Sequence, residues 1–246
     1  MKITTIHKNK APIRLSDKSS LRQLEKIKPS FKTAALIQTP AIKKPSEPQQ
    51  KNEKPPNPLP SDSLLLKKGQ KTALPANSAK LKVHVESTFV EQILPCRIDT
   101  EVFLLSEHGQ VPGEDWFVFY NQPESPDKAV LLQATNNDSD FSEELLLDLT
   151  KLDRRINKLV FIATLDQAQE KNYNFSLVQK LCFRIVDSQN NKEILRFEPP
   201  DYYRNVISMV IGEIYLYKNE WRFNPVGDGT AEGLEKLCEK YGIETA

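Results

Sequence analysis

The sequence from residue 80 onward consists largely of short runs in which apolar and polar side chains alternate. The run KLKVHVE (80–86) sets Leu81, Val83 and Val85 on one face, with Lys, His and Glu side chains on the other. This period of two predicts a half-buried β-strand, on whose outer face His84 meets water as an ordinary surface residue. Further runs rich in apolar, aromatic and β-branched residues predict strands at 100–105, 115–121, 128–133, 144–149, 158–165, 182–187, 192–197, 205–217 and 220–223.

Turn-forming residues separate these runs, as in SQNN (188–191) and KN (218–219). Many short strands with turns about every ten residues are typical of a β-sandwich or barrel. In TAEGLEKLCEKYG (230–242) the apolar side chains instead recur at three- and four-residue spacing, which predicts a C-terminal helix that Gly242 ends. A short second helix is a further expectation, at NFSLVQKL (174–181). The pattern predicts an all-β domain with little helix.

Composition divides the chain near residue 60. Of its 34 basic and 33 acidic residues, 13 and 4 lie in residues 1–60, a net charge of +9; the remainder carries 21 and 29, a net charge of −8. Nine of the seventeen prolines lie in the first part, which has no glycine and one aromatic residue, Phe31. Such a segment buries too little apolar surface to offset its chain entropy. We therefore expect a disordered basic tail at 1–61 and one folded domain at 62–246.

The cysteines and the apolar runs indicate the cellular compartment. Cys96, Cys182 and Cys238 are widely spaced and form no CxxC pair, which predicts reduced thiols, two of them buried as small hydrophobes. No apolar run reaches the roughly 18 residues of a membrane span. The N-terminus lacks the apolar region of a secretory signal. We expect a cytoplasmic protein.

No motif indicates catalysis. The chain lacks the GxSxG, HExxH and GxxxxGK[ST] patterns, and no nucleophile motif adjoins His7, His84 or His108. The glycine-rich VGDGTAEG (226–233) precedes the predicted helix, where it either cradles a phosphate or lets helix and strand pack closely. We expect a protein that is not an enzyme. An enzyme that uses Asp228 of this loop, or nearby carboxylates, stays an alternative.

The most acidic stretch is ATNNDSDFSEELLLDL (134–149), which ends in an apolar run. Such a stretch either holds a metal ion or is a solvated turn that enters a strand. Its acidic residues are Asp138, Asp140, Glu143, Glu144 and Asp148.

Four blocks follow one another along the chain: LKKGQKTAL (66–74), FVFYNQPESPD (117–127), NFSLVQKLCFRIVD (174–187) and VIGEIYLYKNEWRFNPVGDGTAEGLEKLCEKYGI (210–243). In this order they resemble the TerD family of bacterial tellurium-resistance and stress proteins. The second block is similar to the family's F-Y-N-Q-x-x-S-P-D. The resemblance covers nearly all of 62–246 and leaves out the tail.

The resemblance implies a two-sheet β-sandwich with calcium bound by acidic loops at one end. It also implies a role in resistance to tellurite and other stresses, by binding or scaffolding rather than by catalysis.

The family's first calcium motif, D-x-D-x-D before a strand, is similar here to PCRIDTEVFLL (95–105). Asp99 matches the third aspartate, while Pro95 and Arg97 stand in place of the first two. A cation at Arg97 disfavours a divalent ion, because like charges about 4 Å apart repel by ~4 kcal/mol at an effective dielectric of 20.

In the second calcium motif Glu143 matches the family's glutamate, whereas Phe141 and Ser142 replace paired aspartates. Calcium takes six to eight oxygen ligands, and its affinity follows the number of charged ones. Three interpretations stay open: a calcium site like the family's, a weaker rebuilt site, or a solvated acidic turn with no ion. Arg97 is also placed to pair with Asp99 or Asp140 and so replace the ion's structural role. The candidate ligands are Asp99, Asn137, Asp138, Asp140 and Glu143.

We expect other stress-system proteins as partners. The basic tail allows peripheral contact with the inner face of an anionic membrane, although it also serves as a plain linker or associates with the acidic domain. Its charges are dispersed among prolines without interleaved aromatic residues, so we find no strong nucleic-acid signal.

Overall fold

The computed structural model describes residues 63–90, 96–134, 142–200 and 204–245. These residues form two six-stranded sheets packed as a sandwich. Sheet A has the order β1 (Leu64–Leu66), β10 (Glu193–Phe197), β9 (Val178–Asp187), β3 (Lys80–Phe89), β7 (Ser142–Asp148) and β6 (Val130–Ala134). Sheet B has the order β2 (Thr72–Ala73), β12 (Glu220–Thr230), β11 (Ser208–Tyr217), β8 (Lys158–Leu165), β4 (Ile98–Leu105) and β5 (Phe117–Val118).

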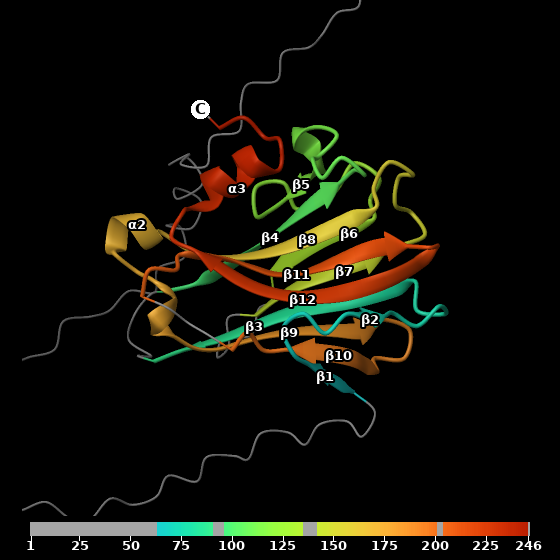
Figure 1. Cartoon of the computed structure of the whole chain (residues 1–246), viewed down its shortest axis with the longest axis horizontal. Coiled ribbons are helices and arrows are strands. Elements are labelled where there is room, and N and C mark those ends of the chain that lie inside the picture. The colour runs from blue at the N-terminus through green and yellow to red at the C-terminus, as the bar shows by residue number, and fades with distance from the viewer. Residues whose placement is uncertain (1–62, 91–95, 135–141, 201–203, 246) are drawn as a thin grey trace, which may run out of the picture. The chain divides into compact units, whose positions relative to one another are not determined.

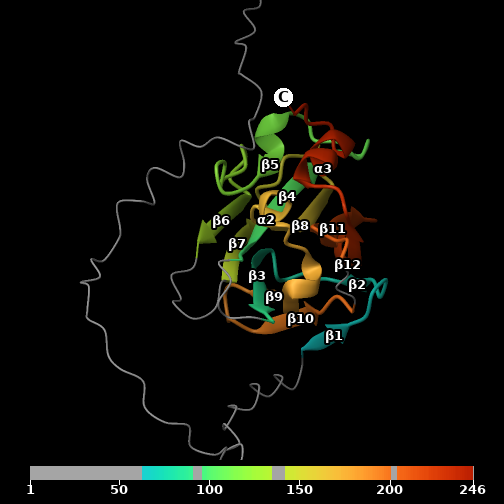
Figure 2. The ribbon, with the colours of Figure 1, turned by 90° about the vertical axis from the view of Figure 1, so that its left-hand side faces the viewer.

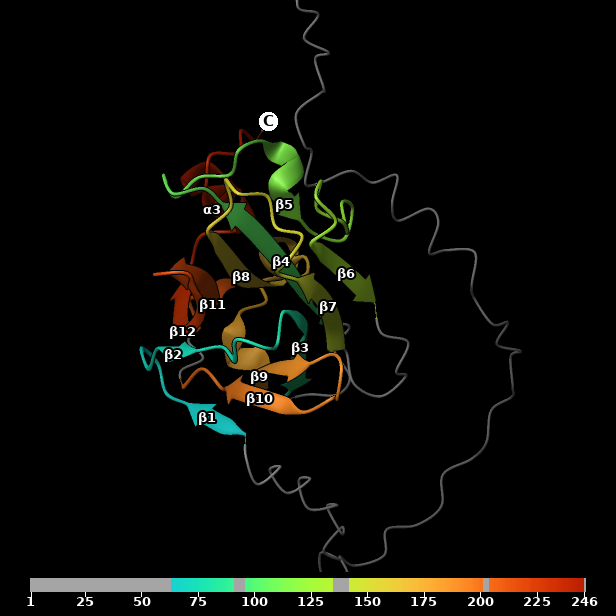
Figure 3. The same ribbon diagram turned by 90° about the vertical axis from the view of Figure 1, so that its right-hand side faces the viewer.

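Helical elements are short in the described part of the chain. They are α2 (Ala168–Lys171), α3 (Leu234–Lys240) and single 3-10 turns at Glu114–Trp116 and Phe175–Leu177. Figures 2 and 3 view the sandwich from opposite sides, with β11 and β12 at one flank and β6 and β7 at the other. The all-β sandwich with a C-terminal helix that the sequence predicts is confirmed.

The core lies between the two sheets and is rich in phenylalanine. Phe183 of sheet A stacks on Phe223 of sheet B with ring centroids 5.2 Å apart. It also meets Phe161 of sheet B edge-on, with centroids 5.1 Å apart. All three rings are fully buried. Their removal from water, at roughly 25 cal/mol per Å² of apolar surface, holds the sheets together.

The outer face of sheet B is covered at β4 by the C-terminal segment. Val102 and Leu104 of β4 point into the core, while Phe103 packs on Tyr241 with ring centroids 4.7 Å apart. Every residue of β4 is consequently buried. In Figure 1, α3 lies beside β4 and β5, away from β3, β9 and β10. Polar side chains near the start of β4 are therefore enclosed on a face that a two-layer sandwich usually exposes.

Two sequence-based expectations need correction. The helix predicted at 174–181 is wrong beyond one 3-10 turn, because Val178 begins β9, which pairs with both β3 and β10. This double pairing outweighs local helix propensity. The C-terminal helix begins only at Leu234, since Thr230 still pairs with Ser208 as part of β12.

The tail at 1–61 lies outside the described residues, so its disorder and the domain boundary stay predictions. Among the described residues, no helix has the length and apolar character needed to cross a membrane. Cys96, Cys182 and Cys238 are all buried and unbridged, which confirms the predicted free thiols.

Candidate functional site at the acidic end of the sandwich

Three segments meet where β4 and β7 begin and β8 ends. The amide of Asp166, just after β8, donates to the carbonyl of Arg97, just before β4, at 2.9 Å. The amide of Thr100 in sheet B donates to Glu143 Oε2 of sheet A at 2.6 Å. This bond ties the two sheets together at their edge. We call Arg97, Asp99, Glu101, Glu143 and Asp166 the acidic cluster.

Arg97 is the cation of the acidic cluster. Its Nε lies 2.7 Å from Asp99 Oδ1, which confirms the predicted pairing of these two side chains. The contact combines opposite charges with a side-chain hydrogen bond, and both favour the ionised form of Asp99. Burial opposes the charge of Arg97, but Asp99, Asp166 and Glu143 together raise the pKa of its guanidinium above the ordinary value.

Asp99, Glu101 and Glu143 of the acidic cluster are harder to ionise than free carboxyl groups. Asp99 is 8% exposed, and burial raises its pKa despite the nearby Arg97. Burial likewise raises the pKa of Glu143 to about 7, against the hydrogen bond from Thr100, and the charge of Asp99 adds to the shift. Protons therefore compete with any cation for the Glu143 carboxylate near neutral pH.

Glu101 is a member of the cluster that the sequence analysis missed. It follows Asp99 by two residues in β4, is 2% exposed, and accepts a hydrogen bond from Thr164 Oγ1 at 2.6 Å. Its second carboxylate oxygen, Oε2, has no hydrogen-bond partner among the described residues. Burial raises its pKa well above the ordinary value. Because side chains alternate along a strand, residues 97, 99 and 101 share one face, and this spacing is the signal that predicts Glu101 as a neighbour of Asp99.

The predicted calcium ligands are only partly brought together. Asp99 and Glu143 belong to the acidic cluster, whereas Asn137, Asp138 and Asp140 lie outside the described residues. Where the chain is described, no group of three or more His, Cys, Asp or Glu side chains is arranged to hold a metal ion. Arg97 occupies Asp99 and the Thr100 amide occupies Glu143. The described donors therefore do not fit the six to eight free oxygens that calcium takes.

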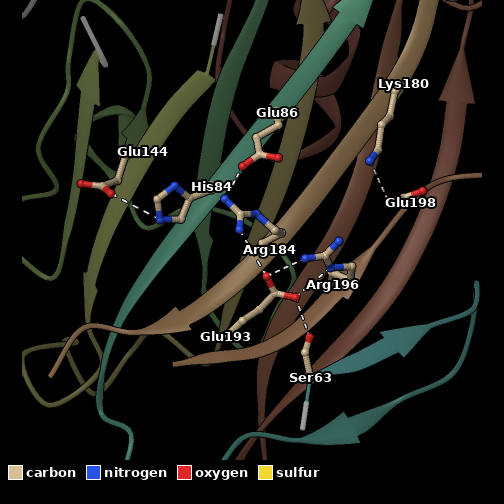
Figure 4. Close-up of polar contacts among 9 residues, drawn as sticks. All are labelled: Ser63, His84, Glu86, Glu144, Lys180, Arg184, Glu193, Arg196 and Glu198. Atoms are coloured by element: carbon tan, nitrogen blue, oxygen red, sulfur yellow. Dashed lines mark hydrogen bonds and ion pairs between the residues drawn. The ribbon is translucent and has the colours of Figure 1, made fainter. Parts of the chain in front are cut away.

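A second polar cluster covers the outer face of sheet A (Figure 4). We call it the outer charge network; its residues are Ser63, His84, Glu86, Glu144, Lys180, Arg184, Glu193, Arg196 and Glu198. His84 of β3 stands directly opposite Glu144 of β7 and Arg184 of β9. Its Nε2 is 3.4 Å from Glu144. The predicted outward orientation is correct, but His84 is half-buried between neighbours rather than freely solvated.

Glu193 is the centre of the outer charge network. It is 5% exposed and receives Arg196 Nε at 2.7 Å, Arg184 Nη1 at 3.2 Å and Ser63 Oγ at 2.5 Å. Arg184 also pairs with Glu86. Burial opposes ionisation of Glu193, yet these donors lower its pKa to about 2. The network is thus a surface of mostly paired charges, which the cross-strand pairs stabilise.

The glycine-rich segment is part of a strand. Residues 226–230 belong to β12, and Asp228 Oδ1 accepts from Lys68 Nζ at 2.5 Å. A Cβ built on Gly229 would lie 2.7 Å from Val206, so glycine is needed for close packing. The packing interpretation is supported, with Val206 rather than the helix as the neighbour. Asp228 is an exposed ion-pair residue, which leaves it no enclosed site.

Comparison with known proteins places this geometry in context. The profile of the TerD domain matches residues 63–241. The tellurium resistance protein TerD of Serratia marcescens is 32% identical over 153 residues, which are 61% of this chain and 79% of that protein. General stress protein 16U of Bacillus subtilis is 28% identical over 151 residues, 60% of this chain and 78% of that protein. The crystal structure of a telluride resistance protein homologue from Streptomyces coelicolor A3(2) has a TM-score of 0.50 at 14% identity, covering 68% of this chain and 99% of that one.

Proposed function

The chain belongs to the TerD family, and we propose that it is a stress-response protein that binds other proteins without catalysis, its calcium binding weakened or lost. Relatives named for tellurium resistance and for general stress support the stress-response role. Partners of the same stress system are the binding targets that this role implies. The sandwich would then act as a rigid interaction module.

One observation carries the metal-independent part of the proposal. Arg97 stands where the family's calcium motif has an aspartate, and its guanidinium lies 2.7 Å from Asp99. A permanent cation at this place repels a second one and uses the carboxylate that a metal ion would need.

The proposed absence of catalysis rests on the histidines and the thiols. Among the described residues, His84 and His108 face the carboxylates of Glu144 and Glu107 rather than a thiol. Burial raises the pKa of all three thiols, that of Cys96 to about 11 and those of Cys182 and Cys238 to about 12. A thiol with a raised pKa is a poor nucleophile. Two alternatives remain for testing: an adaptor tethered to an anionic membrane by the basic tail, and a calcium site completed by the acidic stretch.

The test is quantitative affinity capture with the full chain, from cells grown with and without tellurite, each lysate divided between excess calcium and a calcium chelator. A tag-only chain serves as the control. The proposal predicts proteins enriched over the control to the same extent with calcium and with chelator. Capture that needs calcium would contradict metal independence, and no enrichment in any arm would contradict the binding role. Capture of membrane lipid from the lysate, without enriched proteins, would favour the tethered adaptor.

A further inference from the structure

We propose that the open edge of sheet A at β1 is the surface through which two copies of this chain pair, as antiparallel strands related by a two-fold axis at Leu65. This inference goes beyond the proposed function, since it concerns self-association rather than the capture of other proteins. Pairing of this kind would join the A sheets of the two copies through main-chain hydrogen bonds.

The two edges of sheet A are finished differently. At β6, the preceding chain runs back along the strand: the Leu132 amide donates to the Pro123 carbonyl at 2.7 Å, and the Ser125 amide donates to the Val130 carbonyl at 2.9 Å. At the opposite edge β1 pairs with β10, and no described strand lies beyond it. In Figures 1 and 3, β1 is the outermost strand, past β10. Such an edge presents main-chain N–H and C=O groups to which a further strand can bind.

The side chains of β1 are apolar although the edge is open. Leu64 is 50% exposed and Leu65 is 55% exposed, whereas Leu66 is buried in the core. Leu65 stands opposite Arg196, on the outer face of sheet A. Leu64 stands opposite Leu195, whose side chain lies in the core. Edge strands usually carry charges that prevent pairing, and β1 has none within it. A second strand would remove leucine side chains from water on both faces.

β1 is already held as a strand at both of its ends. At its start, Ser63 Oγ donates to Glu193 Oε1 at 2.5 Å. At its end, the turn that follows Leu66 is closed by the Gln70 amide, which donates to the Lys67 carbonyl at 2.9 Å. A segment that is ordered beforehand loses little further conformational entropy when it binds.

The charges beside β1 favour a second copy in antiparallel orientation. The sequence SDSLLLKK (61–68) runs from an acidic to a basic end around the three leucines. Antiparallel pairing about Leu65 brings Lys68 of one copy opposite position 62 of the other, which is an aspartate. Parallel pairing would set lysine against lysine, which is unfavourable. Asp62 lies outside the described residues, so this match rests on the sequence. A two-fold axis also closes the assembly at two copies.

The first measurement is the mass of the full chain by sedimentation at increasing concentration, for the wild type, Leu65→Lys and Leu216→Lys. We expect the wild type to pass from monomer to dimer between ~1 and ~100 µM, as for a small interface. Leu65→Lys places two ammonium groups together at the axis, so the dissociation constant should rise at least about tenfold. Leu216→Lys should dimerise like the wild type, since Leu216 is a 39% exposed leucine of β11 in sheet B.

A cysteine at the axis tests the register of the pairing. Leu65→Cys would set two thiols opposite each other, and oxidised glutathione would take up their two electrons and two protons as a disulfide forms. Leu64→Cys is the matched control, because two copies of residue 64 would lie roughly 8 Å apart, beyond the ~7 Å between Cα atoms that a disulfide spans. The native thiols of Cys96, Cys182 and Cys238 are buried and should not react. We expect a disulfide-linked dimer from Leu65→Cys and none from Leu64→Cys.

A wild-type chain that stays monomeric over this range would overturn the inference, as would equal cross-linking of the two cysteine variants. A Leu65→Lys chain that dimerises as tightly as the wild type would place the contact elsewhere and overturn it too. If the chain is monomeric and Leu65→Lys loses the proteins captured from lysate, the edge binds a different protein and self-pairing is wrong. All of these results leave the proposed function standing, because capture with calcium and with chelator tests it separately.

Discussion

Glu193 and Glu143 are both largely enclosed carboxylates on strands of sheet A, yet their pKa values shift in opposite directions. The pKa of Glu193 falls to about 2, because Arg196, Ser63 and Arg184 donate to it. The pKa of Glu143 rises to about 7, because burial outweighs the hydrogen bonding from Thr100 and the charge of Arg97. Burial alone thus does not decide ionisation; the number of donors around the carboxylate does.

The contrast separates a structural surface from a candidate site. The outer charge network sets Glu86, Glu193 and Glu198 each against an arginine or a lysine, so most of its carboxylates meet a cation (Figure 4). The acidic cluster instead places three carboxyl groups, those of Asp99, Glu143 and Asp166, within range of one guanidinium, that of Arg97. Groups whose pKa values are perturbed without full compensation concentrate at functional sites more often than paired ones. The end of the sandwich is the better place to look for function.

The largest expected loss of stability is in the outer charge network, at Glu193. Glu193→Ala would leave Arg184 and Arg196 without their shared carboxylate, and removing one partner of a buried pair costs about 3 kcal/mol or more. Urea unfolding of the full chain measures the loss. Glu198→Ala is the matched control, since its pair with Lys180 at 3.2 Å is exposed and should contribute less than about 1 kcal/mol. Equal losses in the two variants would contradict the central role of Glu193.

A smaller effect is expected at Glu143 and depends on pH. Its folded pKa is raised, so the unfolded chain binds fewer protons than the folded one between about 4.5 and about 7. Stability from this group is full below pH 4.5 and is lost as pH rises through 7, by on the order of 2 kcal/mol. Glu143→Gln should flatten this part of a stability profile taken from pH 5 to pH 8. If stability falls with pH as steeply in the variant as in the wild type, a group other than Glu143 causes the pH dependence.

The smallest effect is expected at His84. Burial, then Arg184, lowers its pKa, with Glu144 and Glu86 acting in the opposite sense. The unfolded chain therefore takes up the proton first, and stability is lost as pH falls below about 6.5. His84→Gln should remove a loss of less than about 1 kcal/mol between pH 7 and pH 5, measured by thermal melts. A variant that loses more stability than the wild type on acidification would refute the assignment.

Local pattern was sufficient to predict the strands and part of the site. Alternation placed Leu81, Val83 and Val85 inward, and the same period makes Arg97 and Asp99 neighbours on one face. It did not predict β9 at Val178, where pairing on both sides outweighs a helix-like pattern.

Long-range contacts could not be read from the sequence. Glu86 meets Arg184 across nearly one hundred positions, and Glu143 meets the Thr100 amide of the other sheet. Register and sheet packing, rather than local periodicity, decide such pairs. The enclosure of Glu101 likewise depends on where the chain after β12 covers sheet B.

The most direct test of the contrast is a carboxyl-carbon NMR titration of the full chain with labelled glutamate, assigned with Glu143→Gln and Glu193→Gln. We predict that Glu143 titrates near pH 7, while Glu193 stays ionised until about pH 2 or until the chain unfolds. Titration of both groups near the ordinary value of about 4.3 would contradict the account. The acidic cluster would then be no less compensated than the outer charge network.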